Sequence, residues 1–112
     1  MFHYHNKIFK SIINTSNGDV ELETTFYYKQ KGNIVTASYS GGNIIEGNLI
    51  ALVNKDGVLN MHYQHINNQY QLMTGICTSI PELMPNNKIR LHEKWQWTSG
   101  DKSSGESIIE EV

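Results

Sequence analysis

An acidic residue shares one face of a predicted β-strand with both tryptophans of the chain. The stretch LHEKWQWTSG runs from Leu91 to Gly100, and successive residues of a strand point to opposite faces. Glu93, Trp95 and Trp97 are therefore expected on the same side. A carboxylate among aromatic rings can accept hydrogen bonds from a ligand or, with a raised pKa, act as a general base.

Glu93 also has a structural interpretation. Burying a bare carboxylate is costly, so an inward-facing Glu93 must be paired, hydrogen-bonded or protonated. Inward hydroxyl groups, or a backbone amide, would supply such hydrogen bonds; the candidate hydroxyl groups belong to Thr24, Tyr28, Thr74 and Ser107. At the level of the sequence both interpretations remain open.

A binding site for a small molecule is the function that the residue pattern favours. Aromatic walls with a few orienting polar groups are typical of ligand pockets. The predicted ligand-binding residues are polar or aromatic and lie on inward faces: Tyr28, Tyr63, His65, Glu93, Trp95 and Trp97. One alternative is an enzyme of lyase or isomerase type, with Glu93 as general base and a tyrosine or His65 as the acid. Another is a solid, non-catalytic barrel with a structural or oligomer-forming role.

The histidines and the single cysteine do not form a recognisable metal motif. A zinc or iron site needs at least three protein ligands held together. His3 and His5 can share a strand face, but His62 and His65 fall on opposite faces. Cys77 lies in TGICT without a neighbouring histidine and is interpreted as a small buried apolar side chain. No metal and no cofactor is expected.

Short apolar segments separated by turn signals predict an all-β protein. Asn-Gly, Asp-Gly and Gly-Gly pairs recur at short intervals and supply the positive φ angles that tight hairpins need. Between them lie runs rich in Tyr, Ile, Val, Thr and Phe, which favour strands. The predicted strands are Tyr4–Ile13, Val20–Gln30, Ile34–Ser40, Ile44–Val53, Val58–His65, Tyr70–Ser79, Ile89–Thr98 and Glu106–Glu111.

Eight short antiparallel strands indicate a single domain over residues 1–112. Closing the sheet into an up-and-down barrel removes exposed edges and leaves an interior that side chains or one small ligand can fill. A flattened β-sandwich is the alternative. In the third, fourth and sixth predicted strands apolar residues occur on both faces, so a second copy of the chain is expected to cover part of the outer surface.

One connection breaks the pattern of short hairpins. The segment SIPELMPNN, Ser79 to Asn87, holds both prolines of the chain and the apolar pair Leu83 and Met84. Proline cannot donate a hydrogen bond to a β-ladder, so this segment is predicted to lie outside the sheet. It is interpreted either as a plug at one end of the barrel or as a lid over its mouth.

Charge and composition argue against some classes of binding partner. The chain has 112 residues, a net charge near −2, and Arg90 as its only arginine. Nucleic-acid binding depends on clustered cations and is not expected. The N-terminal residues MFHYHNKIFK contain no long apolar run, so neither a signal peptide nor a membrane span is predicted. With one cysteine and no disulfide possible, a cytoplasmic location is expected.

Three segments carry a resemblance to a known family: YSGG at Tyr39–Gly42, TGICT at Thr74–Thr78, and Leu91–Gly100. Together with essentially the whole chain, they resemble small bacterial proteins that are classed as avidin-like, or calycin-like, barrels. The resemblance implies a β-barrel fold. Members often carry the name N-acetylglutamate synthase, and no activity accompanies the family that can be transferred to this chain.

The residues do not support that synthase name. Such acetyltransferases bind the pyrophosphate of acetyl-CoA on an Arg/Gln-x-x-Gly-x-Gly/Ala turn that opens a helix. Arg90 is followed here by Leu-His-Glu-Lys without glycine, and no segment has helical periodicity. The Gly-x-Trp signature of lipocalins is also missing from the first predicted strand, so no lipocalin or biotin-binding residues are transferred.

Overall fold

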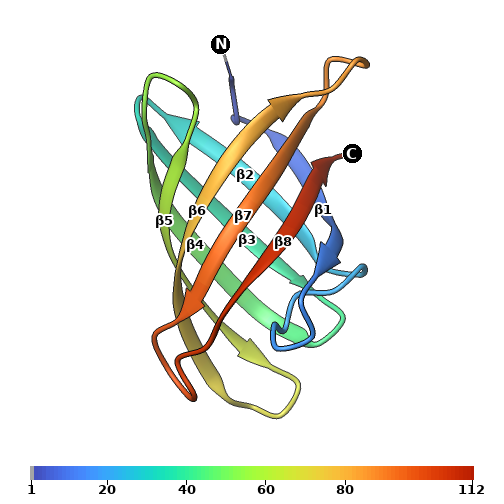
Figure 1. Ribbon diagram of the computed structural model, residues 1–112, viewed down its shortest axis with the longest axis vertical. Coiled ribbons are helices and arrows are strands. Elements are labelled where there is room, and N and C mark those ends of the chain that lie inside the picture. Colours follow the sequence, from blue (N-terminus) through green and yellow to red (C-terminus); the bar gives the residue numbers. More distant parts are fainter. Residues whose placement is uncertain (1) are drawn as a thin grey trace.

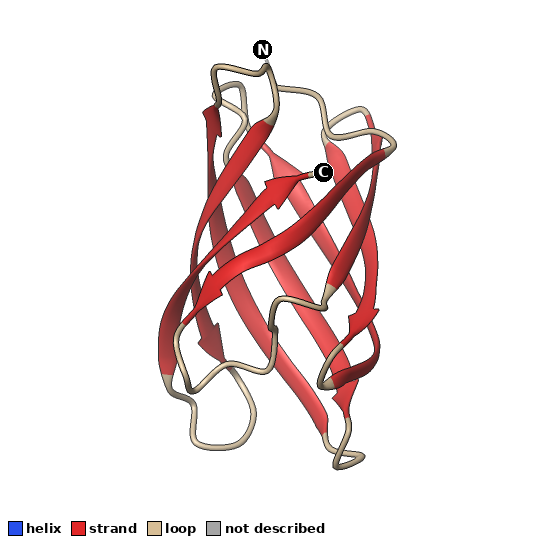
Figure 2. Ribbon diagram, turned by 90° about the vertical axis from the view of Figure 1, so that its right-hand side faces the viewer, coloured by secondary structure: helices blue, strands red, loops and turns tan. Residues whose placement is uncertain are grey.

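Eight antiparallel strands form one closed barrel in the computed structural model, which describes residues 2–112 (Figure 1, Figure 2). The strands are β1 (Lys7–Asn14), β2 (Thr25–Lys31), β3 (Ile34–Gly41), β4 (Ile44–Val53), β5 (Leu59–Asn67), β6 (Leu72–Leu83), β7 (Ile89–Trp97) and β8 (Ser104–Glu111). Each strand pairs with the next along the chain, and β8 pairs back with β1. The prediction of an up-and-down barrel is confirmed. The flattened sandwich is wrong, because the first and last strands are hydrogen-bonded to each other.

No helix among the described residues has the length and apolar character needed to cross a membrane.

Alternating burial sorts the side chains into an inner and an outer set. Along β7 the predicted inward residues, such as Leu91 and Trp95, are buried. The same alternation holds along β5, where His65 is buried and His62 is exposed. The structure also shows which face of β4 points inward: Leu49 is on the inner face, and the apolar Ile50 next to it is on the outer face.

Tyr4 closes the end of the barrel at which the chain begins, at the top of Figure 1. Its hydroxyl donates a hydrogen bond to the Gly57 carbonyl over 2.6 Å. Its ring packs on Tyr28, with the centroids 6.2 Å apart, and Tyr28 packs in turn on Phe9 at 4.8 Å. The predicted first strand therefore starts later, at Lys7, and Tyr4 is fully buried against the barrel end.

The prediction for Ser79–Asn87 is wrong, because most of this segment belongs to the sheet. Strand β6 continues to Leu83, and Pro81 lies opposite Leu91 of β7. Pairing of β6 with β5 ends at Ser79, so beyond it β6 has only β7 as a neighbour. A proline is tolerated there because its missing N–H belongs to a locally free edge. The segment is thus neither a lid nor a plug, and Leu83 is 59% exposed.

The long connection lies instead between β1 and β2, and the predicted strand Val20–Gln30 begins only at Thr25. A local turn replaces its first residues. The Thr24 N–H donates to the Glu21 carbonyl over 2.9 Å, and the Glu21 N–H donates to Thr24 Oγ1 over 3.2 Å. This turn leaves Leu22 exposed rather than inward.

Replacing Leu91 and Leu83 by alanine tests which leucine supports the core. Leu91→Ala removes a fully buried side chain and is expected to lower the free energy of unfolding by about 2–5 kcal/mol. Leu83→Ala is the matched control at the exposed end of β6 and is expected to change it by less than about 0.5 kcal/mol. Urea unfolding measures both changes. An equal loss in the two variants would mean that Leu83 seals the barrel after all.

Candidate functional site

Glu93 lies inside the barrel between two serines on neighbouring strands. The register places Ser79 of β6 and Ser107 of β8 directly opposite Glu93. Ser79 Oγ donates a hydrogen bond to Glu93 Oε2 over 2.8 Å, and Ser107 Oγ donates to Oε1 over 3.0 Å. Of the hydroxyl groups expected from the sequence, only that of Ser107 bonds Glu93. Ser79 is absent from that set because the sequence predicts the end of a strand there, followed by a loop.

Burial and two hydrogen bonds have opposite effects on the pKa of Glu93. Burial raises the pKa of Glu93, and the bonds from Ser79 and Ser107 lower it by less. A carboxylate offers about four lone pairs, and each oxygen uses one on a serine. Each oxygen can therefore accept a further hydrogen bond.

A small cavity lies beside this carboxylate and has a volume of about 50 Å³. Its wall combines aromatic rings with a few polar groups. The lining residues are Asn14, Asp19, Val20, Phe26, Tyr39, Leu49, Met61, Tyr63, His65, Cys77, Glu93, Trp95, Trp97 and Ser107. An open space next to Glu93 is the geometric condition for any ligand contact with this group.

The cavity brings together five of the six residues predicted as ligand-binding. Those five are Tyr63, His65, Glu93, Trp95 and Trp97. Tyr28 is the exception, because it packs between Tyr4 and Phe9 nearer the closed end and is not part of the cavity wall. Tyr28 is only 1% exposed, and its hydroxyl has no hydrogen-bond partner among the described residues.

The two tryptophans bind the end of β1 and the β1–β2 connection that follows it at the open end of the barrel. Trp97 Nε1 donates to the Asn17 carbonyl over 3.0 Å, and Trp95 Nε1 donates to Asn14 Oδ1 over the same distance. Gly18 lies so close to the Trp95 ring that a side-chain carbon there would meet it at 2.9 Å. Both indole rings are thus part of the wall and also attach the loop that covers the mouth.

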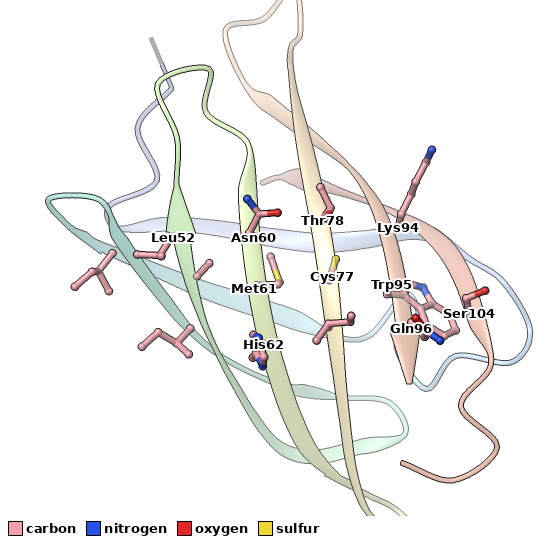
Figure 3. Close-up of a pocket in the computed structure, with 14 residues that line it drawn as sticks. Leu52, Asn60, Met61, His62, Cys77, Thr78, Lys94, Trp95, Gln96 and Ser104 are labelled. Carbon is pink, nitrogen blue, oxygen red and sulfur yellow. The ribbon is translucent and has the colours of Figure 1, made fainter. Parts of the chain in front are cut away.

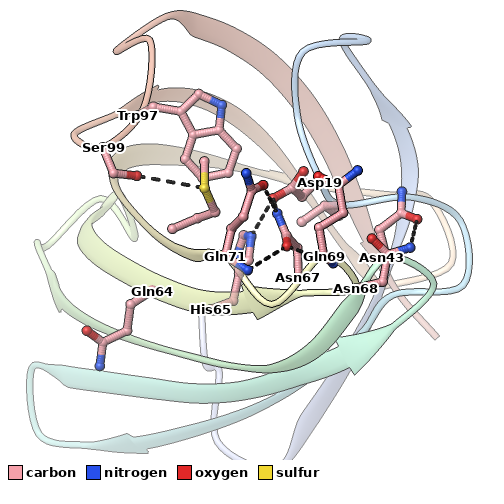
Figure 4. Close-up of polar contacts among 12 residues, drawn as sticks. Asp19, Asn43, Gln64, His65, Asn67, Asn68, Gln69, Gln71, Trp97 and Ser99 are labelled. Carbon is pink, nitrogen blue, oxygen red and sulfur yellow. Dashed lines mark hydrogen bonds and ion pairs between the residues drawn. The ribbon is translucent and has the colours of Figure 1, made fainter.

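Asp19, His65 and Tyr39 form a hydrogen-bonded chain at this mouth, where His65 and Asp19 meet in Figure 4. His65 Nε2 lies 3.0 Å from Asp19 Oδ2, and His65 Nδ1 lies 2.9 Å from the Tyr39 hydroxyl. Burial lowers the pKa of His65, and the bond to Asp19 raises it by less. At neutral pH the imidazole is therefore neutral, with Nε2–H donating to Asp19 and Nδ1 accepting from Tyr39.

Sequence reasoning missed Asp19, Tyr39 and Asn14. Asp19 follows the Asn17-Gly18 turn signal and has the pattern of an ordinary turn residue. Tyr39 alternates in phase with the buried Val35 on β3, a strand whose inward face the sequence leaves undecided. Gly47 of β4 pairs with both Tyr39 and His65 and so brings these two side chains together, whereas Asp19 reaches His65 from the β1–β2 connection.

No group of three or more His, Cys, Asp or Glu side chains close enough to hold a metal ion occurs within residues 2–112. Cys77 is free and buried in the cavity wall. Burial raises the pKa of its thiol, and the nearby Glu93 charge adds to that effect. The Cys77 side chain is therefore a protonated thiol of low reactivity at neutral pH.

The chain matches a known protein family over almost its full length. A family model described as "Avidin-like protein" matches residues 2–112. The chain belongs to this family. The resemblance stated from the sequence is confirmed, and so is the fold that it implied. Comparison with curated proteins and with solved structures gives no match.

Replacing Glu93 by glutamine tests whether the pKa of this carboxyl group is raised. Because the folded protein holds the Glu93 proton more tightly than the unfolded chain, this stabilisation is complete below the ordinary glutamate pKa of about 4.3 and is lost as pH rises through the raised pKa. Relative to wild type, Glu93→Gln should therefore gain stability as pH rises. Between the unfolded and folded pKa values the slope of this gain should approach about 1.4 kcal/mol for each pH unit.

Unfolding curves for both proteins across the acid-to-neutral range measure this gain. Glu106→Gln is the matched control, because Glu106 is on β8 next to Ser107 and is exposed. It should follow the wild-type pH dependence. If Glu93→Gln also runs parallel to wild type at every pH, burial does not raise this pKa.

Proposed function

We propose that this protein, as a single β-barrel domain over residues 1–112, binds a small polar molecule inside the barrel beside Glu93. The proposal rests on one observation. The Glu93 carboxylate lines a cavity of about 50 Å³, and each of its oxygens has a lone pair that no serine uses. Aromatic side chains around a few orienting polar groups are typical of such sites. The proposal assigns ligand contact to Tyr63, His65, Glu93, Trp95 and Trp97 as a group.

The volume limits what enters the barrel. Pockets for drug-sized ligands measure about 300–1,000 Å³, several times the space beside Glu93. Only a group of a few atoms fits there. The remainder of a larger ligand would extend past Asp19, whose side chain is 25% exposed at the mouth.

Binding is favoured over catalysis by the hydrogen bonds of His65. The enzyme alternative needs an acid opposite Glu93, and His65 or a tyrosine is the candidate. Both ring nitrogens of His65 are already paired, with Asp19 and Tyr39. Burial also raises the pKa of Tyr63 far above neutrality, so its hydroxyl is a poor proton donor in acid–base catalysis.

Filling the cavity tests the binding function. Cys77→Val adds about one methyl group to the wall and is expected to reduce ligand occupancy while keeping the fold. Ile76→Val is the control on the neighbouring outward position of β6. Native mass spectrometry of each protein purified from its own host should show ligand-bound mass for wild type and the control but not for Cys77→Val. Only apo protein in the wild-type spectrum, together with a flat thermal-shift screen of metabolites, would exclude the proposal.

We further propose that a second copy of the chain covers an apolar area on the outside of the barrel. A surface hollow of about 760 Å³ spans β3 to β8 and is shown in Figure 3. Exposed apolar side chains on it include Ile50, Leu52 and Ile76. Lys94 is the only Lys, Arg, Asp or Glu among the described lining residues, so two such faces can meet with little charge repulsion.

Introducing a charge in this area tests the pairing of copies. Leu52→Glu places a carboxylate on the apolar face and is expected to convert the oligomer to monomer, as measured by sedimentation equilibrium. Leu72→Glu is the control, an exposed leucine outside the hollow. A wild-type protein that is monomeric at tens of micromolar would exclude a stable pairing through this face.

A further inference from the structure

We infer that the ligand is an organic cation that inserts a small alkylammonium group into the cavity beside Glu93. This inference rests on the proposed binding function and specifies its ligand class. It follows from four features of the cavity wall: its charge, its supply of hydrogen-bond donors and acceptors, its aromatic rings, and its size.

The acidic side chains of the described wall are two carboxyl groups, and a cation bound beside Glu93 would favour the ionised form of this carboxyl group. Glu93 lies on one side of the cavity and Asp19 at its mouth. None of the described lining residues is Lys or Arg. Within residues 2–112 the only ion-pair partner of Asp19 is His65, whose imidazole is neutral at neutral pH, so the Asp19 charge is not compensated. A cation is the ligand that such a field attracts.

The wall also offers hydrogen-bond acceptors, whereas most of its hydrogen-bond donors already bond to other protein groups. The two indole N–H groups bind Asn17 and Asn14. The hydroxyl of Ser107 binds Glu93, and the amide N–H of Asn14 donates to the Val20 carbonyl over 2.9 Å. An anion would find few free donors here. An ammonium group brings three N–H donors of its own and meets the unused lone pairs of Glu93.

Aromatic faces complete the site. The ring of Trp97 lies 5.5 Å from that of Trp95 and 5.8 Å from that of Tyr63, both at steep interplanar angles. Because the indole N–H groups are bonded to Asn14 and Asn17, aromatic carbon is what these two lining rings offer a ligand. Aromatic faces attract cations, and the attraction is strongest where water is excluded.

The volume sets the size of the inserted group. An engineered cavity of about 150 Å³ holds benzene, which has six non-hydrogen atoms. By that scale the 50 Å³ cavity encloses about two, an ammonium nitrogen and its first carbon, and the next carbon of the ligand lies toward the mouth.

Three probes of equal size and different charge test the inference on the wild-type protein. Ethylammonium, ethanol and formate each have three non-hydrogen atoms and are cationic, neutral and anionic at neutral pH. The two indole N–H signals of Trp95 and Trp97 in a nitrogen–proton correlation spectrum report binding, because these are the only tryptophans. Ethylammonium is expected to shift both signals with saturation near the millimolar range, which is close to the limit for so few atoms. Ethanol and formate should bind at least about tenfold more weakly.

Glu93→Gln keeps the shape of the side chain and removes its charge, so ethylammonium should bind it at least about tenfold more weakly than wild type. Glu106→Gln removes the same charge from the outer face and should bind like wild type. Ethanol or formate binding as tightly as ethylammonium would overturn the inference, and so would unchanged binding in a folded Glu93→Gln. If Glu93→Gln does not fold, the three probes on the wild-type protein still decide.

Failure of this inference can be distinguished from failure of the binding function. A neutral or anionic metabolite that copurifies with wild type and is lost in Cys77→Val would refute the cationic ligand and leave binding in place. Absence of any copurifying or screened ligand, together with no response to ethylammonium, would refute both.

Discussion

The hydrogen bonds between β1 and β8 close the sheet, and the interior depends on that closure. In an open sheet each inward face would have solvent at its edges, whereas a closed barrel of eight strands leaves one narrow shared space. A polar group that points into this space must find its partners on neighbouring strands. Glu93 does so through Ser79 and Ser107, which the register places directly opposite it on the two adjacent strands. Gly105 lies opposite Trp95 and leaves room for its ring, because a side-chain carbon at Gly105 would overlap it.

Much of this architecture could be predicted from residue patterns, and the misses have local causes. Turn pairs such as Asn-Gly locate the hairpins, and strict alternation identifies the inner faces of β5 and β7. In the sequence, Pro81 predicts the end of a strand. The sequence does not show that β6 continues past the point where its pairing with β5 ends, and there a proline is tolerated. Thr24 has the pattern of a strand residue, although its side chain stabilises a turn by accepting from the backbone of Glu21.

The candidate site was predictable only where it lay on strands of clear alternation. Glu93, Trp95 and Trp97 are on one such strand, and the sequence places them together. Asp19 comes from a turn, and its contact with His65 joins residues 46 positions apart, which no spacing rule relates. Tyr28 is correctly predicted to point inward, but the sequence carries no information about depth along the barrel axis, so its distance from the cavity could not be seen.

The seal formed by Tyr4 has a kinetic consequence. With that end filled, the proposed ligand beside Glu93 would exchange with solvent past the β1–β2 connection, which the Trp97 indole and the Asp19–His65 contact hold in place. Entry and exit then share one passage, and water in the cavity must leave by the route through which the ligand arrives. For the proposed ligand, residence time would then depend on how often this loop lifts from the barrel rim, and two ligands of equal affinity would share that gating rate.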